Sequence, residues 1–129
     1  MTTRSEQKFF RCEVCGNITG LIQDAGIPMV CCEKEMVELI PNATPASTQA
    51  HIPAVIISGD QVDVTVGAVE HPMADEHYIQ WVYLKTEQGG QRKSLGAGDV
   101  PKASFVLIDD KPLAVYSYCN LHGLWEKTL

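Results

Sequence analysis

The chain has 129 residues, of which 45% are hydrophobic and 20% charged, and its net charge is −6 at pH 7. This length suits one soluble domain, or one domain with a small appendage. The acidic balance excludes the basic surface that nucleic-acid binding needs, and no run approaches the roughly 18 apolar residues of a membrane-spanning helix. Because the N-terminal sequence also lacks the pattern of a secretion signal, we expect a cytoplasmic protein without membrane or nucleic-acid partners.

Residues 1–40 are expected to form a small β domain held together by a metal ion. Glycine and proline divide this segment into short runs that are typical of strands and turns. A unit of about 40 residues buries too little apolar surface to fold without a staple. The candidate metal ligands are four cysteines: Cys12, Cys15, Cys31 and Cys32.

The four cysteines follow a C-x2-C pattern and then a vicinal pair. Four thiolates form closed tetrahedral sites for iron or zinc. The C-x2-C turn, which ends at Gly16, is expected to aim backbone N–H groups at the sulfurs. Adjacent side chains on an extended backbone point apart, so the chain must bend at Cys31 and Cys32 if both bind one metal. A purely structural zinc ion remains an alternative to iron, whereas disulfides are disfavoured by the odd total of five cysteines.

Residues 41–50 contain two prolines and no charged residue, which favours a linker or an extended crossing segment. Beyond them, apolar alternation and β-branched runs predict strands near 62–66, 78–84, 103–108 and 113–118, separated by turns. No stretch shows helical periodicity. Residues 51–129 are therefore expected to form an all-β sandwich. Its core is expected to include Trp81, Tyr83, Phe105, Leu107 and Val115.

The histidines and the remaining cysteine lie near the edges of predicted strands and are expected to form a second metal site. They are His51, His71, His77, Cys119 and His122. Four imidazoles and one thiolate suit iron, whereas a structural zinc stops at four ligands. Five ligands on an octahedral ion leave one position open, which indicates chemistry at a redox metal. Structural histidines remain the alternative for each residue taken alone.

The strings VGAVEHPMADEHYIQW and YCNLHG, together with the N-terminal cysteine pattern, resemble the desulfoferrodoxins, which are two-iron superoxide reductases. The resemblance covers nearly the whole chain. It implies a desulforedoxin-like first domain and an immunoglobulin-like catalytic domain, with the four histidines as equatorial ligands and Cys119 as the axial ligand. It also implies two iron ions per chain, superoxide as substrate, a rubredoxin-type electron donor and a homodimer.

By this resemblance, ferrous iron passes one electron to superoxide, and the Cys119 thiolate favours release of the peroxide product. Backbone N–H groups of Leu121 and His122 are expected to tune the sulfur. The sequence departs from the family just before His51, where Gln49-Ala50 replaces the usual Glu-Lys pair. We therefore expect slower capture of superoxide with a weak dependence on ionic strength, unless another lysine, such as Lys102, substitutes.

Other functions remain open from the sequence alone. An electron carrier would have two iron sites and no substrate, and a superoxide dismutase would produce oxygen as well as peroxide. A zinc-stapled binding module would contain no iron. A blue-copper carrier is disfavoured because its site uses two histidines, not four. Met73 is expected to be a packing residue.

Overall fold

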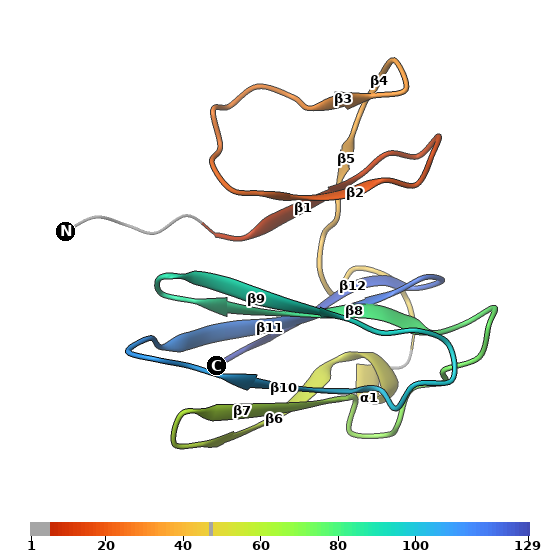
Figure 1. The fold of residues 1–129 in the computed structure, drawn as a ribbon. Helices are drawn as coiled ribbons and strands as arrows, with labels where there is room; N and C mark the ends of the chain where they lie inside the picture. The colour runs from red at the N-terminus through yellow and green to blue at the C-terminus, as the bar shows by residue number, and fades with distance from the viewer. Residues whose placement is uncertain (1–5, 47) are drawn as a thin grey trace. The chain divides into compact units, whose positions relative to one another are not determined.

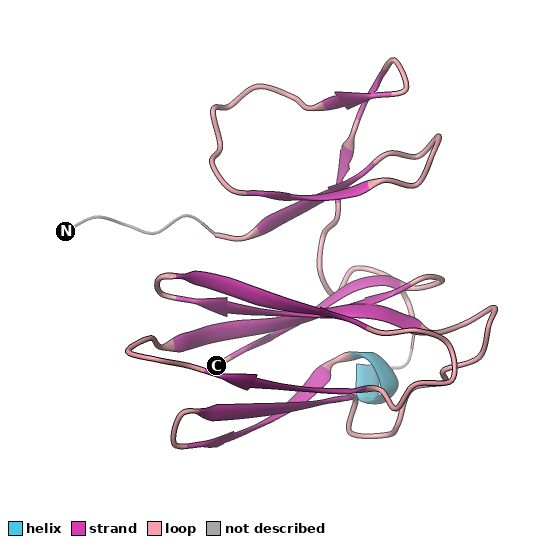
Figure 2. Ribbon diagram, viewed as in Figure 1, coloured by secondary structure: helices cyan, strands magenta, loops and turns pink. Residues whose placement is uncertain are grey.

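The structure, a computed structural model, describes residues 6–46 and 48–129 (Figure 1). The chain divides into two compact units, one ending at Ile40 and the other spanning Pro41–Leu129. The regular elements of the described residues are strands joined by loops, apart from one helical turn (Figure 2), which confirms the predicted all-β class. No helix within the described ranges is long and apolar enough to cross a membrane.

Short antiparallel strands build the N-terminal unit. They are β1 (Lys8–Arg11), β2 (Ile18–Leu21), β3 (Val30–Cys31), β4 (Lys34–Glu35) and β5 (Val37–Glu38). β1 lies between β2 and β5, and β3 pairs with β4. Among the described residues of this unit, the buried hydrophobic side chains are those of Phe9 and Cys12. So small an apolar core cannot offset the entropy of ordering the chain, which leaves the stabilising role to the cysteines.

The C-terminal unit is a sandwich of two antiparallel sheets, visible as two layers in Figure 1. The strands are β6 (Pro53–Ser58), β7 (Gln61–Val66), β8 (Ile79–Thr86), β9 (Gly89–Ser94), β10 (Lys102–Val106), β11 (Pro112–Cys119) and β12 (Gly123–Thr128). One sheet has the order β10-β7-β6 and the other the order β12-β11-β8-β9. The β6–β7 hairpin lies in the first sheet, and the β8–β9 and β11–β12 hairpins lie in the second, as is common in β-sandwiches.

The core lies between the two sheets. Val62, Val64 and Val66 of β7 are at most 2% exposed, because the period of a strand sends every second side chain to one face. They pack with residues from both sheets, including Phe105 and Val115.

The predicted core was largely correct. Trp81, Phe105, Leu107 and Val115 are buried, but Tyr83 is only partly buried. Its neighbours Val82 and Leu84 are fully buried in the core between the sheets, and alternation along β8 sends Tyr83 to the other face. Met73 packs against the core, as predicted.

Several elements were not predicted, because their sequences carry little pattern. β9, with the sequence GGQRKS, is an exposed edge strand in which only the first residue is partly buried. It lies between the strands predicted near 78–84 and 103–108, where the sequence predicted only turns. α1 (Thr48–His51) is a single helical turn, too short for a helical period. It falls at the end of the segment that was predicted to be a linker.

α1 packs closely against the loop that follows β7. The Val69 N–H donates to the Gln49 carbonyl oxygen at 2.9 Å. A Cβ added at Gly67 would lie 2.6 Å from that same oxygen and 2.8 Å from the Ile52 carbonyl oxygen, so only glycine permits this approach. The contact places His51, at the end of α1, beside the segment that carries His71.

Candidate metal centres

Cys12, Cys15, Cys31 and Cys32, the four-cysteine cluster, come together in the N-terminal unit. Their sulfurs all lie within 4.8 Å of one another. The Sγ atoms of Cys15 and Cys31 are 3.6 Å apart, and those of Cys31 and Cys32 are 4.0 Å apart. A tetrahedral metal with bonds to sulfur of about 2.3 Å has sulfur–sulfur edges of roughly 3.8 Å. The four sulfurs therefore have the spacing that one iron or zinc ion requires.

Two local turns produce this cluster. In the C-x2-C turn, the Cys15 N–H donates to the Cys12 Sγ at 3.5 Å and the Gly16 N–H donates to the Cys12 carbonyl oxygen at 2.9 Å. The expected bend at the vicinal pair is confirmed: Cys32 and the following Glu33 both have positive φ angles, of 52° and 64°. These left-handed residues rotate the second half of the cluster toward the first.

The sulfurs also perturb one another. The Cys15 N–H lowers the pKa of Cys12 to about 6, with smaller contributions from other hydrogen bonds. Hydrogen bonding with the thiols of Cys15 and Cys12 raises the pKa of Cys32 to about 12. One thiolate forms easily and the next is opposed, chiefly because hydrogen bonds to the other thiols favour the neutral form of Cys32. A bound cation removes that opposition and is the natural partner of four thiolates.

The second group of candidate ligands gathers in the C-terminal unit from elements that are distant in the sequence. His51 ends α1, His71 and His77 lie in the segment between β7 and β8, Cys119 ends β11, and His122 precedes β12. We call these five residues the His/Cys cluster. His51, His71 and Cys119 are buried, the last at 0% exposure. The ligand atoms of His51, His77, Cys119 and His122 all lie within 4.8 Å of one another.

The four imidazoles form a square. Going around it, the ring centroids are 4.6 Å apart for His51–His71, 4.7 Å for His71–His77, 5.1 Å for His77–His122 and 4.9 Å for His122–His51. Neighbouring rings are nearly perpendicular, at 76° to 88°. His51 and His77 face each other across the square, with centroids 6.4 Å apart.

Ring nitrogens point to the centre of this square. The His51 Nε2 lies 3.1 Å from the His71 Nε2 and 3.1 Å from the His122 Nδ1. Bonds of about 2.1 Å from a metal to nitrogen place adjacent corners of a square roughly 3.0 Å apart. The Cys119 Sγ lies 3.8 Å from the His122 Nδ1. The spacing fits one metal with four nitrogen donors and one sulfur donor.

The protonation of the rings also fits a metal. The His71 Nδ1 donates to the Pro72 carbonyl oxygen at 2.6 Å. In the neutral ring the proton therefore sits on Nδ1, and the Nε2 carries a lone pair. Burial lowers the pKa of His71 to about 4, so the ring is neutral at pH 7. The His77 Nε2 is buried without a hydrogen-bond partner. Lone pairs that converge in this way need a cation between them.

Two supporting residues were not predicted from the sequence. The buried Ser117 hydroxyl donates to the His51 carbonyl oxygen at 3.0 Å. The Trp125 ring stacks on the His51 ring, with centroids 4.9 Å apart, and its Nε1 donates to the His122 carbonyl oxygen at 3.2 Å. Both residues bond to main-chain groups, and no spacing in the sequence announces such contacts. The predicted donation from Leu121 and His122 to the Cys119 sulfur stays a prediction.

The residues that depart from the family pattern lie beside the cluster. Ala50 directly precedes His51 in α1, and the Gln49 side chain is exposed. Gln49 lines a surface cavity of about 460 Å³ that is also lined by Lys127. Lys102, the lysine suggested from the sequence, is exposed at the start of β10 and pairs with Thr65 of β7. Lys127, which the sequence alone did not single out, thus lines the same cavity as Gln49.

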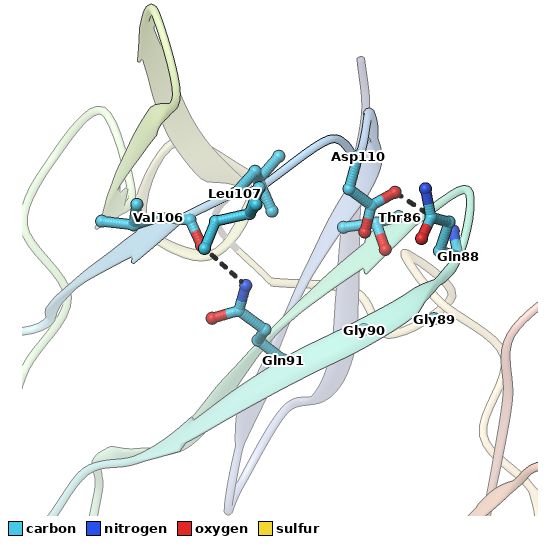
Figure 3. Close-up of a pocket in the computed structure, with 9 residues that line it drawn as sticks. Thr86, Gln88, Gly89, Gly90, Gln91, Val106, Leu107 and Asp110 are labelled. Carbon is cyan, nitrogen blue, oxygen red and sulfur yellow. Dashed lines mark hydrogen bonds between the residues drawn. The ribbon is translucent and has the colours of Figure 1, made fainter.

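Another cavity, of about 400 Å³, lies where the β8–β9 turn meets the end of β10 (Figure 3). It is lined by Thr86 and Leu107, and the Gln91 amide donates across it to the Val106 carbonyl oxygen at 3.0 Å. Thr86 ends β8, whereas Ile79 begins β8 and pairs with Cys119. This cavity is therefore at the far end of the strand from the His/Cys cluster.

Comparison with known families gives two matches that follow each other along the chain. Residues 43–128 match the family described as Desulfoferrodoxin, and residues 3–39 match the Desulfoferrodoxin N-terminal domain. A desulfoferrodoxin of Syntrophotalea carbinolica is 42% identical over 117 residues, which are 91% of this chain and 92% of that protein. A desulfoferrodoxin of Nitratidesulfovibrio vulgaris is 34% identical over 122 residues, which are 95% of this chain and 96% of that protein.

The fold is also similar to solved structures. The crystal structure of the superoxide reductase from Treponema pallidum matches with a TM-score of 0.81 and 37% identity, over 96% of this chain and 100% of that chain. A one-iron superoxide reductase from Giardia intestinalis matches with a TM-score of 0.55 and 33% identity, over 63% of this chain and 97% of that chain. The similarity thus extends both to a protein that matches nearly this whole chain and to a protein that matches about two thirds of it.

Proposed function

The chain belongs to the desulfoferrodoxin family, and from that premise we propose that its His/Cys cluster holds the iron at which superoxide is reduced to hydrogen peroxide. The chain is a superoxide reductase, an oxidoreductase that acts on superoxide. The observation that carries the residue assignment is the square of four imidazoles whose nitrogens converge, with the His51 Nε2 3.1 Å from two neighbouring ring nitrogens. The thiol of Cys119 adds a fifth donor.

The cofactors are two iron ions per chain, one for each cluster. The unpartnered, buried His77 Nε2 and the neutral His71 ring provide the lone pairs that an iron ion takes. Four imidazoles and a thiolate would give an iron ion that accepts six ligands five donors from the chain, which would leave room for a substrate. The four sulfurs of the other cluster form a closed site, which suits storage or relay of an electron.

An iron ion bound by the cluster would supply the one electron that, together with two protons, converts superoxide to hydrogen peroxide. The imidazoles would hold it without adding charge, because a histidine that binds a metal through its lone pair is neutral. The buried Cys119 thiolate adds one negative charge where water cannot screen it, which disfavours retention of an anionic product. Gln49 and Ala50 carry no ionisable group, so neither of them supplies these protons.

The assignment of Cys119 is tested by metal analysis and visible spectra of the wild type and of Cys119→Ser. We expect two iron ions and no zinc per chain in the wild type, and a sulfur-to-iron absorption band that appears when the His/Cys cluster is oxidised. The serine variant should lose that band while the absorption of the four-cysteine cluster persists. An unchanged band in Cys119→Ser would refute the assignment.

The function is tested by mixing the ferrous protein with superoxide and following oxidation of the His/Cys cluster. We expect oxidation much faster than the spontaneous decay of superoxide. His71→Ala should abolish this reaction, whereas Asp75→Ala, which changes an exposed residue of the same loop, should preserve it. A wild-type protein that leaves superoxide to decay spontaneously would instead be a pure electron carrier.

We also propose a rubredoxin-type electron donor, a homodimer and a cytoplasmic location. Ile22, Ile27 and Val30 of the N-terminal unit are 65% to 101% exposed, and exposed apolar groups of this kind support association with a second copy. Five free cysteines fit a reducing compartment. Light scattering should give about twice the 14.2 kDa of one chain, and reduced rubredoxin should re-reduce the oxidised protein in stopped-flow mixing.

A further inference from the structure

Asn120 links the two segments that carry Cys119 and His77. It follows Cys119 directly, and its side-chain amide bonds to main-chain groups on both sides of His77. The Oδ1 accepts from the Tyr78 N–H at 3.0 Å, and the Nδ2 donates to the Glu76 carbonyl oxygen at 3.1 Å. The Asn120 N–H also donates to the Tyr78 carbonyl oxygen, at 3.2 Å.

The orientation of this amide is unambiguous. A peptide N–H can only donate and a peptide carbonyl can only accept. The oxygen of Asn120 must therefore face Tyr78, and its nitrogen must face Glu76. No carboxylate, hydroxyl or alkyl side chain offers one donor and one acceptor side by side in this way, so the pair of bonds is specific to an amide.

The opposite side of His77 is held as well. The His77 N–H donates to the Ala74 carbonyl oxygen at 3.1 Å, and the Ala74 N–H donates to the His77 carbonyl oxygen at 3.0 Å. Along an extended backbone, the N–H and C=O of one residue point to one side and those of its neighbours point to the other. Asn120 therefore takes the place of a neighbouring strand, and every main-chain polar group from the Glu76 carbonyl to the Tyr78 N–H is bonded.

We propose that Asn120 is a positioning residue that fixes His77 relative to Cys119, so that one side chain couples a proposed imidazole ligand to the proposed sulfur ligand. The inference rests on the proposed ligand set. His77 stands opposite His51 in the square, and His51 is held separately by Ser117 and Trp125. Asn120 supplies the corresponding support on the His77 side, where the loop is partly exposed and would otherwise bond to water.

A matched pair of variants tests this role. Asn42 makes the same two kinds of bond elsewhere in the C-terminal unit: its Nδ2 donates to the Glu126 carbonyl oxygen at 3.2 Å, and its Oδ1 accepts from the Glu126 N–H at 2.9 Å. Asn120→Asp and Asn42→Asp each remove one donor and add one charge. Only the first acts next to proposed ligands.

The readouts are the absorption band of the oxidised His/Cys cluster, its reduction potential, and the rate at which a chelator removes iron from it. Loss of a group that orients a ligand typically weakens metal binding roughly 10–100-fold. We expect Asn120→Asp to accelerate iron loss by about that factor. The absorption band should become broader and move, and the reduction potential should change. Asn42→Asp should leave all three unchanged, and the four-cysteine cluster serves as an internal control in both.

Asn120→Ser adds no charge and keeps a hydroxyl too short to span both groups, so it should give the same changes if Asn120→Asp fails to fold. If both fold and keep the wild-type band, potential and iron-loss rate, Asn120 has no positioning role. His77→Ala separates this failure from a failure of the ligand set. If His77→Ala loses the band and the Asn120 variants show none of these changes, the positioning role alone is rejected. If His77→Ala keeps the band, His77 is not a ligand, and both the proposed ligand set and the positioning role are rejected.

Discussion

The two residues before His51 carry no charge, although the substrate is an anion and the chain has a net charge of −6. The field of the whole protein therefore opposes the approach of superoxide, and attraction must come from individual cations near the metal. Lys127 lines the cavity that includes Gln49. It joins Lys102 as a candidate for that local charge.

Ala50→Lys places a cation directly beside His51. We expect the second-order rate of superoxide capture at low salt to rise by about tenfold, because electrostatic steering acts on the association rate. The wild-type rate should depend weakly on ionic strength, whereas the variant rate should fall as salt is added. Stopped-flow mixing at several salt concentrations measures both. Ala68→Lys is the control, because Ala68 is exposed, lines the cavity with Gln49 and Lys127, and does not directly adjoin a proposed ligand.

A wild-type rate that already falls steeply with added salt would contradict this expectation. It would show that a lysine already present steers the anion. Lys127→Ala and Lys102→Ala would then identify which lysine does so.

The two clusters of proposed metal ligands could be anticipated from the sequence because cysteine and histidine are scarce, and the clusters account for all nine of them. Their supports could not be predicted. Ser117, Asn120 and Trp125 bond to carbonyl or N–H groups of residues 3 to 66 positions away. Any polar side chain can form such bonds, so only the fold reveals which ones do.

Among the elements, strands with a buried alternating face, such as β7 and the edge strand β10, were predictable, whereas a polar edge strand and a single helical turn were not. β7 and β11 were recognised from their apolar residues, whereas β9 presents a polar, glycine-rich sequence at a sheet edge. α1 forms a single turn against Gly67, a tertiary contact without a local signal. The unpredicted α1 positions His51, so the irregular elements matter most for the site.

β8 contains one polar group that the core leaves unsatisfied. The Thr86 side chain is 1% exposed, and its Oγ1 has no hydrogen-bond partner. Thr86→Val keeps the shape and removes the hydroxyl, so we expect the free energy of unfolding to rise by about 1 kcal/mol. Chemical denaturation measures the change.

Thr65→Val, on the partly exposed face of β7, is the control for β-branched substitution and should change stability little. If Thr86→Val lowered stability instead, the hydroxyl would have to be bonded, for example to a buried water molecule.

Each compact unit of the chain carries its own complete cluster. The two units, ending at Ile40 and beginning at Pro41, share no proposed ligand. Cys15→Ser should therefore abolish iron binding by the four-cysteine cluster and leave the absorption band of the His/Cys cluster intact. The first oxidation by superoxide should proceed at the wild-type rate, and metal analysis with rapid mixing checks both. Loss of the His/Cys band in this variant would show that the units depend on each other.

The product balance of the reaction distinguishes superoxide reduction from superoxide dismutation. Ferrous protein is mixed with superoxide in the absence of oxygen, and the peroxide, oxygen and oxidised iron are counted. A superoxide reductase forms one hydrogen peroxide for each superoxide consumed, oxidises one iron of the His/Cys cluster and releases no oxygen. Formation of one oxygen for every two superoxide ions, with the iron left ferrous, would instead identify a dismutase and contradict the account.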